Sequence, residues 1–155
     1  MRGIPELPFF VYGTLRPGEA NHARHLLGRT VAEEPARWPG AVLYEGPGYP
    51  WALERPGAPG GPAEAGGTGD TGVAGELVTA APGSYRRVLA DLDALEEFLA
   101  PGDPRNLYER VTREVRRADG TPVRAWVYLT APGPAAALRG GTPIPGGDWL
   151  ARPVR

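Results

Sequence analysis

The hydrophobic pattern near the start of the chain predicts a buried strand, a tight turn and a short helix. Residues 9–12, Phe-Phe-Val-Tyr, are a run of bulky, β-prone side chains that ends at Gly13. Residues 19–28 then have the pattern of a short helix closed by Gly28. A glycine at this strand end lets the backbone turn and approach a ligand closely.

The middle of the chain combines strand patterns with a segment that has almost nothing to bury. Residues 36–55 predict two short strands about a Gly-Pro turn, and residues 73–80 predict another strand. Between them, residues 56–72 are nearly all Pro, Gly, Ala and small polar residues, which cannot offset the entropy cost of ordering. We therefore expect a flexible excursion at 56–72 inside one domain that comprises residues 1–155.

The clearest helical pattern covers residues 84–99. Its apolar side chains repeat at the helical period and are Val88, Leu89, Leu92, Leu95 and Leu99. Ser84 has the position and chemistry of a helix N-cap. Residues 107–130 then alternate around Asp119-Gly120, a β-hairpin signal. These elements together predict an α+β fold with a mixed or barrel-like sheet.

Composition and charge exclude several classes of protein. The 155 residues have a net charge of −1 and no basic block, which nucleic-acid and membrane-surface proteins need. No apolar run approaches the ~18 residues of a membrane-spanning helix, and the N-terminus lacks the pattern of a signal peptide. We expect a cytoplasmic protein whose partners include neither nucleic acid nor membranes; no pattern predicts its oligomeric state.

The reactive side chains are few. The chain has no lysine, cysteine or glutamine, so Schiff-base lysines, cysteine nucleophiles and cysteine-ligated zinc are excluded. The histidines, His22 and His25, lack a nearby third ligand, which favours surface or packed side chains over a metal site. The remaining candidates for chemistry are carboxylates, tyrosines, threonines and backbone amides, and we expect no metal and no cofactor.

One carboxylate lies at the edge of the apolar face of the predicted helix. At ~100° per residue, Glu96 points about 55° from the centre of the apolar stripe, whereas Glu97 points roughly opposite to it. A carboxylate in such a place is costly unless it is paired or used. The pattern alone leaves two interpretations open: a boundary glutamate that pairs with an arginine or reaches solvent, or a functional group.

Three separated segments resemble a known family. They are FVYGTLRPGEANH at 10–22, LDALEEF at 92–98 and LYERVTREV at 107–115. In this order they are similar to the gamma-glutamylcyclotransferase-like superfamily, which includes gamma-glutamylamine and butirosin-pathway cyclotransferases. The resemblance covers nearly the whole chain apart from 56–72. It implies a mixed β-barrel or sheet with a few flanking helices.

The resemblance also implies roles for individual residues. Glu96 matches the catalytic acid/base, and the matching substrate-binding residues are Tyr12, Gly13, Thr14, Leu15 and Tyr108. The family usually has glycine after the catalytic glutamate, where this chain has Glu97. An extra carboxylate there can raise the pKa of Glu96 or change the substrate preference.

The implied reaction acts on a small gamma-glutamyl substrate. The amides of residues 13–15 would hold its α-carboxylate, and its α-amine would attack its own γ-carbonyl, releasing an amine and 5-oxoproline. Glu96 would move the protons. Two alternatives stay open: acyl-amine transfer or deprotection in a specialised biosynthetic pathway without 5-oxoproline, and a non-catalytic small-molecule binding domain.

Overall fold

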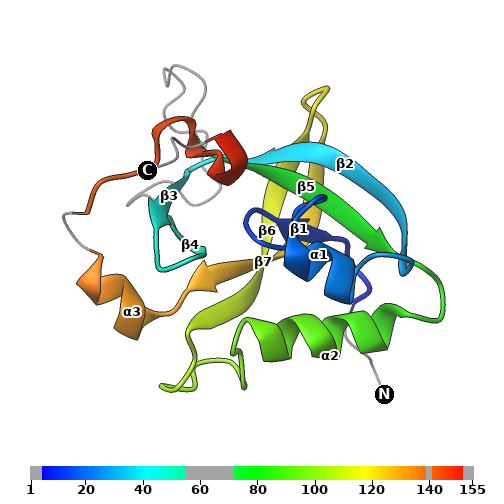
Figure 1. Ribbon diagram of the computed structural model, residues 1–155, viewed down its shortest axis with the longest axis horizontal. Helices are drawn as coiled ribbons and strands as arrows, with labels where there is room; N and C mark the ends of the chain where they lie inside the picture. Colours follow the sequence, from blue (N-terminus) through cyan, green and yellow to red (C-terminus); the bar gives the residue numbers. More distant parts are fainter. Residues whose placement is uncertain (1–4, 55–71, 139–140, 152–155) are drawn as a thin grey trace.

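A closed five-stranded barrel forms the centre of the molecule (Figure 1). The computed structural model describes residues 5–54, 72–138 and 141–151. Around the barrel the strands follow the order β1-β5-β2-β6-β7, and β7 closes on β1. The strands are β1 (Phe9–Val11), β2 (Thr30–Trp38), β5 (Val73–Ala80), β6 (Tyr108–Arg117) and β7 (Pro122–Thr130). Neighbours are antiparallel except β1 and β7, which are parallel.

A small hairpin and short helices surround the barrel. The hairpin consists of β3 (Ala41–Glu45) and β4 (Pro50–Glu54), and β4 contacts β7. The helices are α1 (Ala20–His25), α2 (Tyr85–Leu95) and α3 (Pro132–Ala137), with single 3-10 turns at Pro145–Gly147 and Trp149–Ala151. Figure 1 shows α1 and α2 next to each other beside the barrel.

The predicted α+β class and barrel are confirmed. No helix among the described residues has the length and apolarity needed to cross a membrane.

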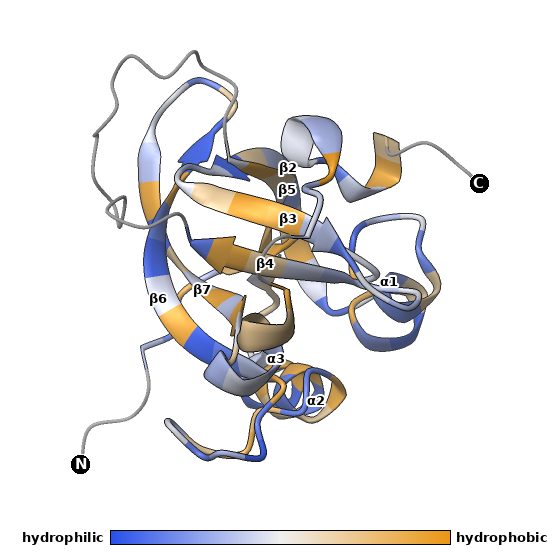
Figure 2. Cartoon of the chain, turned by 90° about the vertical axis from the view of Figure 1, so that its left-hand side faces the viewer, coloured by the Kyte–Doolittle hydropathy of each residue, from blue (hydrophilic) through white to orange (hydrophobic). Residues whose placement is uncertain are grey.

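Hydrophobic side chains form two clusters, one on each side of the barrel wall. The interior contains Phe10, Trp38, Leu77, Val115 and Val127. The cluster between the wall and the helices contains Phe9, Val11, Leu26, Val88 and Leu92. Because successive strand residues face opposite sides, β1 is buried on both faces and is apolar throughout. Strand β6 instead alternates between hydrophilic and hydrophobic residues (Figure 2).

Strand β2 is longer than the sequence pattern predicts. Only its last residues fall within the predicted strand segment at 36–55, and its first half has no apolar alternation. Val31 is 61% exposed, while Glu33 pairs with His22 and Glu34 pairs with Arg117. Ion pairs therefore take the place of apolar contacts over this half of the strand. The rest of the 36–55 segment forms the hairpin β3–β4, as predicted.

The main helix ends earlier than predicted. It stops at Leu95 rather than residue 99, so Leu99 is exposed and Phe98 is buried in its place. Ser84 is at the N-cap position, but its side chain makes no capping hydrogen bond. The first helix is likewise shorter than 19–28, with Gly28 beyond its end at a φ of 83°. The predicted excursion at 56–72 lies outside the described residues except for Gly72.

Candidate active site

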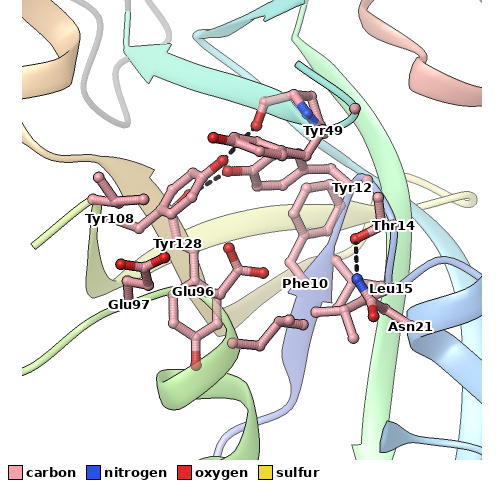
Figure 3. A pocket seen from close by; sticks show the side chains of 16 residues that line it. Phe10, Tyr12, Thr14, Leu15, Asn21, Tyr49, Glu96, Glu97, Tyr108 and Tyr128 are labelled. Carbon is pink, nitrogen blue, oxygen red and sulfur yellow. Dashed lines mark hydrogen bonds between the residues drawn. The ribbon is translucent and has the colours of Figure 1, made fainter. Parts of the chain in front are cut away.

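A cavity of about 170 Å³ lies where β1, β4, β6 and α2 meet (Figure 3). Its wall contains all six site residues predicted from the sequence, namely Tyr12, Gly13, Thr14, Leu15, Glu96 and Tyr108. These residues come from three segments far apart in the chain. The cavity therefore brings together the residues that the resemblance singled out, while their roles stay predictions.

The segment 13–15 contributes its backbone to the cavity. The Leu15 side chain is buried in the cluster next to the helices, and Thr14 Oγ1 accepts a hydrogen bond of 2.8 Å from Asn21 Nδ2. Within the described residues, no backbone or side-chain oxygen accepts a hydrogen bond from the amides of Gly13, Thr14 or Leu15. These three N–H groups therefore have no acceptor among the described residues, and they belong to residues that line the cavity.

Gly13 is required by close packing. A Cβ at this position would lie 2.6 Å from Cδ of Pro50, closer than side chains can approach. The φ of Gly13 is not in the left-handed region, so backbone freedom is not the reason for the glycine. The neighbour that demands the glycine is the Pro50 ring of the β3–β4 hairpin, and the predicted close approach to a ligand stays a prediction.

Arg16 fixes this segment from the side away from the cavity. Its buried guanidinium pairs with Glu76 on β5 and with Asp148 near the 3-10 turns, each at 2.8 Å. Neither the paired acids nor Arg16 lines the cavity. Sequence reasoning did not single out Arg16, although it directly follows the YGTL motif.

Glu96 is the C-cap residue of α2 and follows its last helical residue. Its half-buried carboxyl group lies at the cavity (Figure 3), and within the described residues it has no hydrogen bond or ion pair. Burial raises its pKa from 4.5 to about 8. At neutral pH this carboxyl group is therefore mostly protonated. Burial is the cause of the raised pKa of Glu96. The sequence suggested that Glu97 can raise this pKa, but Glu97 is not among the causes.

The end of α2 explains how Glu96 is positioned. The amide of Phe98 bonds to the carbonyl of Asp93 at 2.9 Å, and the amide of Glu97 bonds to that of Ala94 at 3.2 Å. This is the Schellman pattern, whose C′ residue adopts a left-handed backbone. Glu97 has a φ of 55° and fills that position, which glycine generally occupies. The helix-face argument assumed a longer helix and was wrong in that respect.

The hydroxyl groups of two tyrosines that line the cavity already donate their protons to backbone carbonyls. Tyr108 donates to the carbonyl of Pro50 at 2.6 Å, and Tyr12 donates to the carbonyl of Tyr128. Burial, followed by the neighbouring Tyr108 and Glu96, raises the pKa of Tyr12 well above its usual value, so it stays neutral. Since a phenol has one proton, these oxygens can only accept hydrogen bonds from a ligand.

Sequence reasoning missed other lining residues, among them Tyr49, Tyr128 and Asn21. The Tyr128 hydroxyl donates to Asp93 at 2.7 Å, and Arg110 pairs with the same carboxylate at 2.7 Å. These contacts connect β6 and β7 to α2 one turn before Glu96. Asp93 belongs to the LDALEEF segment, so this segment was the signal in the sequence from which the role of Asp93 in holding the wall together could have been predicted.

The two histidines do not contribute to the cavity. His22 is buried, and its Nε2 lies 2.7 Å from Oε2 of Glu33. His22 is therefore a packed histidine, one of the two possibilities that the sequence favoured over a metal site. Among the residues that the structure describes, no three His, Asp or Glu side chains gather as metal ligands would.

Comparison with known proteins decides the family. The model of the family described as "Gamma-glutamyl cyclotransferase, AIG2-like" matches residues 9–151. The chain belongs to this family. Within the family, it is similar to the gamma-L-glutamyl-butirosin B gamma-glutamyl cyclotransferase of Niallia circulans, with 33% identity over 120 residues. The alignment covers 77% of this chain but only 64% of that relative, so the chain spans less than two thirds of the relative's length.

Solved structures share the fold of the family. The crystal structure of an AIG2-like protein from Mus musculus aligns with a TM-score of 0.56 and 23% identity, over 96% of this chain and 85% of that chain. The solution structure of an Arabidopsis thaliana protein aligns with a TM-score of 0.53 and 25% identity, over 84% of this chain and 66% of that one. The predicted gamma-glutamylcyclotransferase-like fold is thereby confirmed.

Proposed function

We propose that the protein is a gamma-glutamyl cyclotransferase that releases an amine from a gamma-glutamyl substrate and forms 5-oxoproline, with Glu96 as general acid/base. The observation that carries this proposal is the Glu96 carboxyl group, which has no partner among the described residues, at a cavity also lined by three residues whose backbone amides donate to no described acceptor. Membership of the family supports it, as does the printed name of the relative, a gamma-glutamyl cyclotransferase.

The cavity offers complementary contacts for both charged groups on the α-carbon of the substrate. The amides of Gly13, Thr14 and Leu15 would hold the α-carboxylate, because clustered N–H groups bind anions. The acceptor oxygens of Tyr12 and Tyr108 would bind the α-ammonium group. With its α-carbon fixed through these two groups, the glutamyl chain can fold so that its nitrogen approaches its own γ-carbonyl carbon, which is the orientation that an intramolecular attack needs.

Glu96 would carry the protons of the reaction. A substrate ammonium group beside it favours the ionised carboxylate, which then accepts a proton from the nitrogen. The freed amine attacks the γ-carbonyl carbon and a C–N bond forms. The C–N bond to the leaving amine breaks as Glu96 returns its proton to that nitrogen, and the ionised Glu96 then takes up the second proton that the attacking nitrogen must lose to become the ring N–H of 5-oxoproline. The pKa of about 8 is close to that of an α-amino group, ~8, so the proton moves in either direction at little cost.

The test compares two glutamate-to-glutamine variants on gamma-glutamyl-n-butylamide. Glutamine keeps the shape of Glu96 but cannot shuttle a proton, so Glu96→Gln should lower kcat at least ~100-fold. The matched control is Glu114→Gln, because Glu114 is exposed on β6 and far from the lining set. Mass spectrometry should identify 5-oxoproline together with butylamine.

Each other outcome has a distinct meaning. Release of butylamine with free glutamate would replace cyclisation by hydrolytic deprotection. Binding of the compound without turnover by the unmodified protein would support the non-catalytic domain. Wild-type turnover by Glu96→Gln would remove Glu96 from the mechanism.

A further inference from the structure

Glu97 is the charged group at the cavity that the proposed chemistry does not use. Its exposed side chain lines the cavity, and within the described part of the chain it has no hydrogen-bond or ion-pair partner. Among the residues that the structure describes, those that line the cavity include two carboxylates, Glu96 and Glu97, and no arginine or histidine. A ligand group that reaches Glu97 therefore meets an unpaired negative charge.

The backbone at Glu97 gives a second reason to expect a role for this side chain. Its φ of 55° is unfavourable for a residue with a Cβ, and glycine would fill the same cap position without that cost. The helix end thus gains nothing from a glutamate here. What the side chain adds is a carboxylate at the cavity.

The arrangement of the lining residues indicates which part of a substrate would meet Glu97. Figure 3 shows the Glu96 carboxyl group between Thr14 on one side and Glu97 on the other. With the substrate α-carboxylate at segment 13–15 and the leaving nitrogen at Glu96, the remainder of the leaving amine would extend toward Glu97.

We propose that Glu97 selects leaving amines that carry a second positive charge, so that the preferred substrates are gamma-glutamyl derivatives of diamines or polyamines. This inference rests on the proposed function and specifies its substrate class. A distal ammonium group is attracted to the Glu97 carboxylate, whereas a distal carboxylate, as in gamma-glutamyl amino acids, is repelled. Because Glu97 is exposed, the attraction is screened by solvent and falls with added salt.

The test uses three gamma-glutamyl amides of matched chain length: the 4-aminobutylamide (cationic), the n-butylamide (neutral) and the 3-carboxypropylamide (anionic). At low salt we expect kcat/KM to fall in that order, by about two- to fivefold at each step, as for exposed charge pairs. Glu97→Gln, which has the same shape, should bring the three values within about twofold of one another. Glu97→Asp and the control Glu114→Gln should keep the order.

Two results would overturn the inference: the same cation-to-anion ratio in Glu97→Gln as in the unmodified protein, or a preference for the anionic amide. A purely structural role for Glu97 would change stability without changing this ratio. Dissociation constants of the three amides, measured by calorimetry, separate the inference from the proposed function. If no amide yields 5-oxoproline, the proposed function is wrong. Equal dissociation constants for the three amides would then overturn the inference as well.

Discussion

Replacing Glu96 by glutamine should abolish a pH dependence of stability that the buried carboxyl group creates. Between pH 4.5 and about 8 the folded protein keeps a proton on Glu96 that the unfolded chain has lost. Since the folded state then binds more protons, the free energy of unfolding falls as the pH rises through this window. Glutamine has no proton to lose, so this contribution is missing from the variant.

The size of the effect follows from the raised pKa. At 1.36 kcal/mol per pKa unit, the full window corresponds to about 5 kcal/mol. Water reaches the half-buried carboxyl group through the cavity and screens it, so we expect a measured change of about 2–3 kcal/mol. Relative to the unmodified protein, Glu96→Gln should therefore gain about 2–3 kcal/mol of stability between about pH 5 and pH 8.5.

Urea unfolding followed by tryptophan fluorescence at several pH values measures this difference directly. The difference should be small at the acid end, where a protonated carboxyl and an amide are nearly equivalent, and should widen as the pH rises. Glu114→Gln reports the behaviour of an exposed glutamate. A constant difference between Glu96→Gln and the unmodified protein from pH 5 to 8.5 would show that Glu96 has an ordinary pKa.

Three further predictions concern the backbone around the cavity. Glu97→Gly should raise the free energy of unfolding by about 1 kcal/mol, because glycine adopts the left-handed cap conformation without strain; an unchanged urea midpoint would contradict this. Gly13→Ala should destabilise the fold by about 1–3 kcal/mol through its clash with Pro50, and Pro50→Ala in the same chain should restore part of the loss in thermal melts. A substrate whose α-carboxylate is replaced by a primary amide should show at least ~100-fold lower kcat/KM, since charge-assisted hydrogen bonds to the amides of 13–15 are weakened. Comparable turnover of acid and amide would mean that these amides do not bind the carboxylate.

The sequence predicted those elements whose apolar residues alone determine them. Strand β1 is buried on both faces and so shows a continuous apolar run, and the hairpin β6–β7 has a turn signal at Asp119-Gly120. The first half of β2 was not predicted, because it contacts polar and charged side chains rather than apolar ones. Glu33 and Glu34 find their ion-pair partners on other elements, and a linear pattern does not show such pairs.

Cavity-wall residues were predictable where a motif names them and unpredictable where only packing places them. Glu96 was singled out by the motif and lines the cavity although the predicted helix was too long, because the left-handed Glu97 ends the helix at this point; its catalytic role stays a prediction. Tyr128 was missed because its place in the wall depends on the register of β6 and β7. The dependence of Gly13 on Pro50 was equally hidden, since 37 positions separate the two residues.

The ion pairs of Arg16 have a consequence for the order in which the protein matures. Asp148 is separated from Arg16 by 132 positions and Glu76 by 60, so the arginine that fixes segment 13–15 acquires its partners at different stages of synthesis. Such distant contacts form late, because the intervening chain must first be closed into a loop. We expect the cavity wall at segment 13–15 to become rigid only after residue 148 has left the ribosome. A nascent chain halted before that residue should therefore show rapid hydrogen exchange at the amide of Arg16, which donates to the carbonyl of Gly13 at 3.1 Å in the folded protein, even with β1 and β5 already paired.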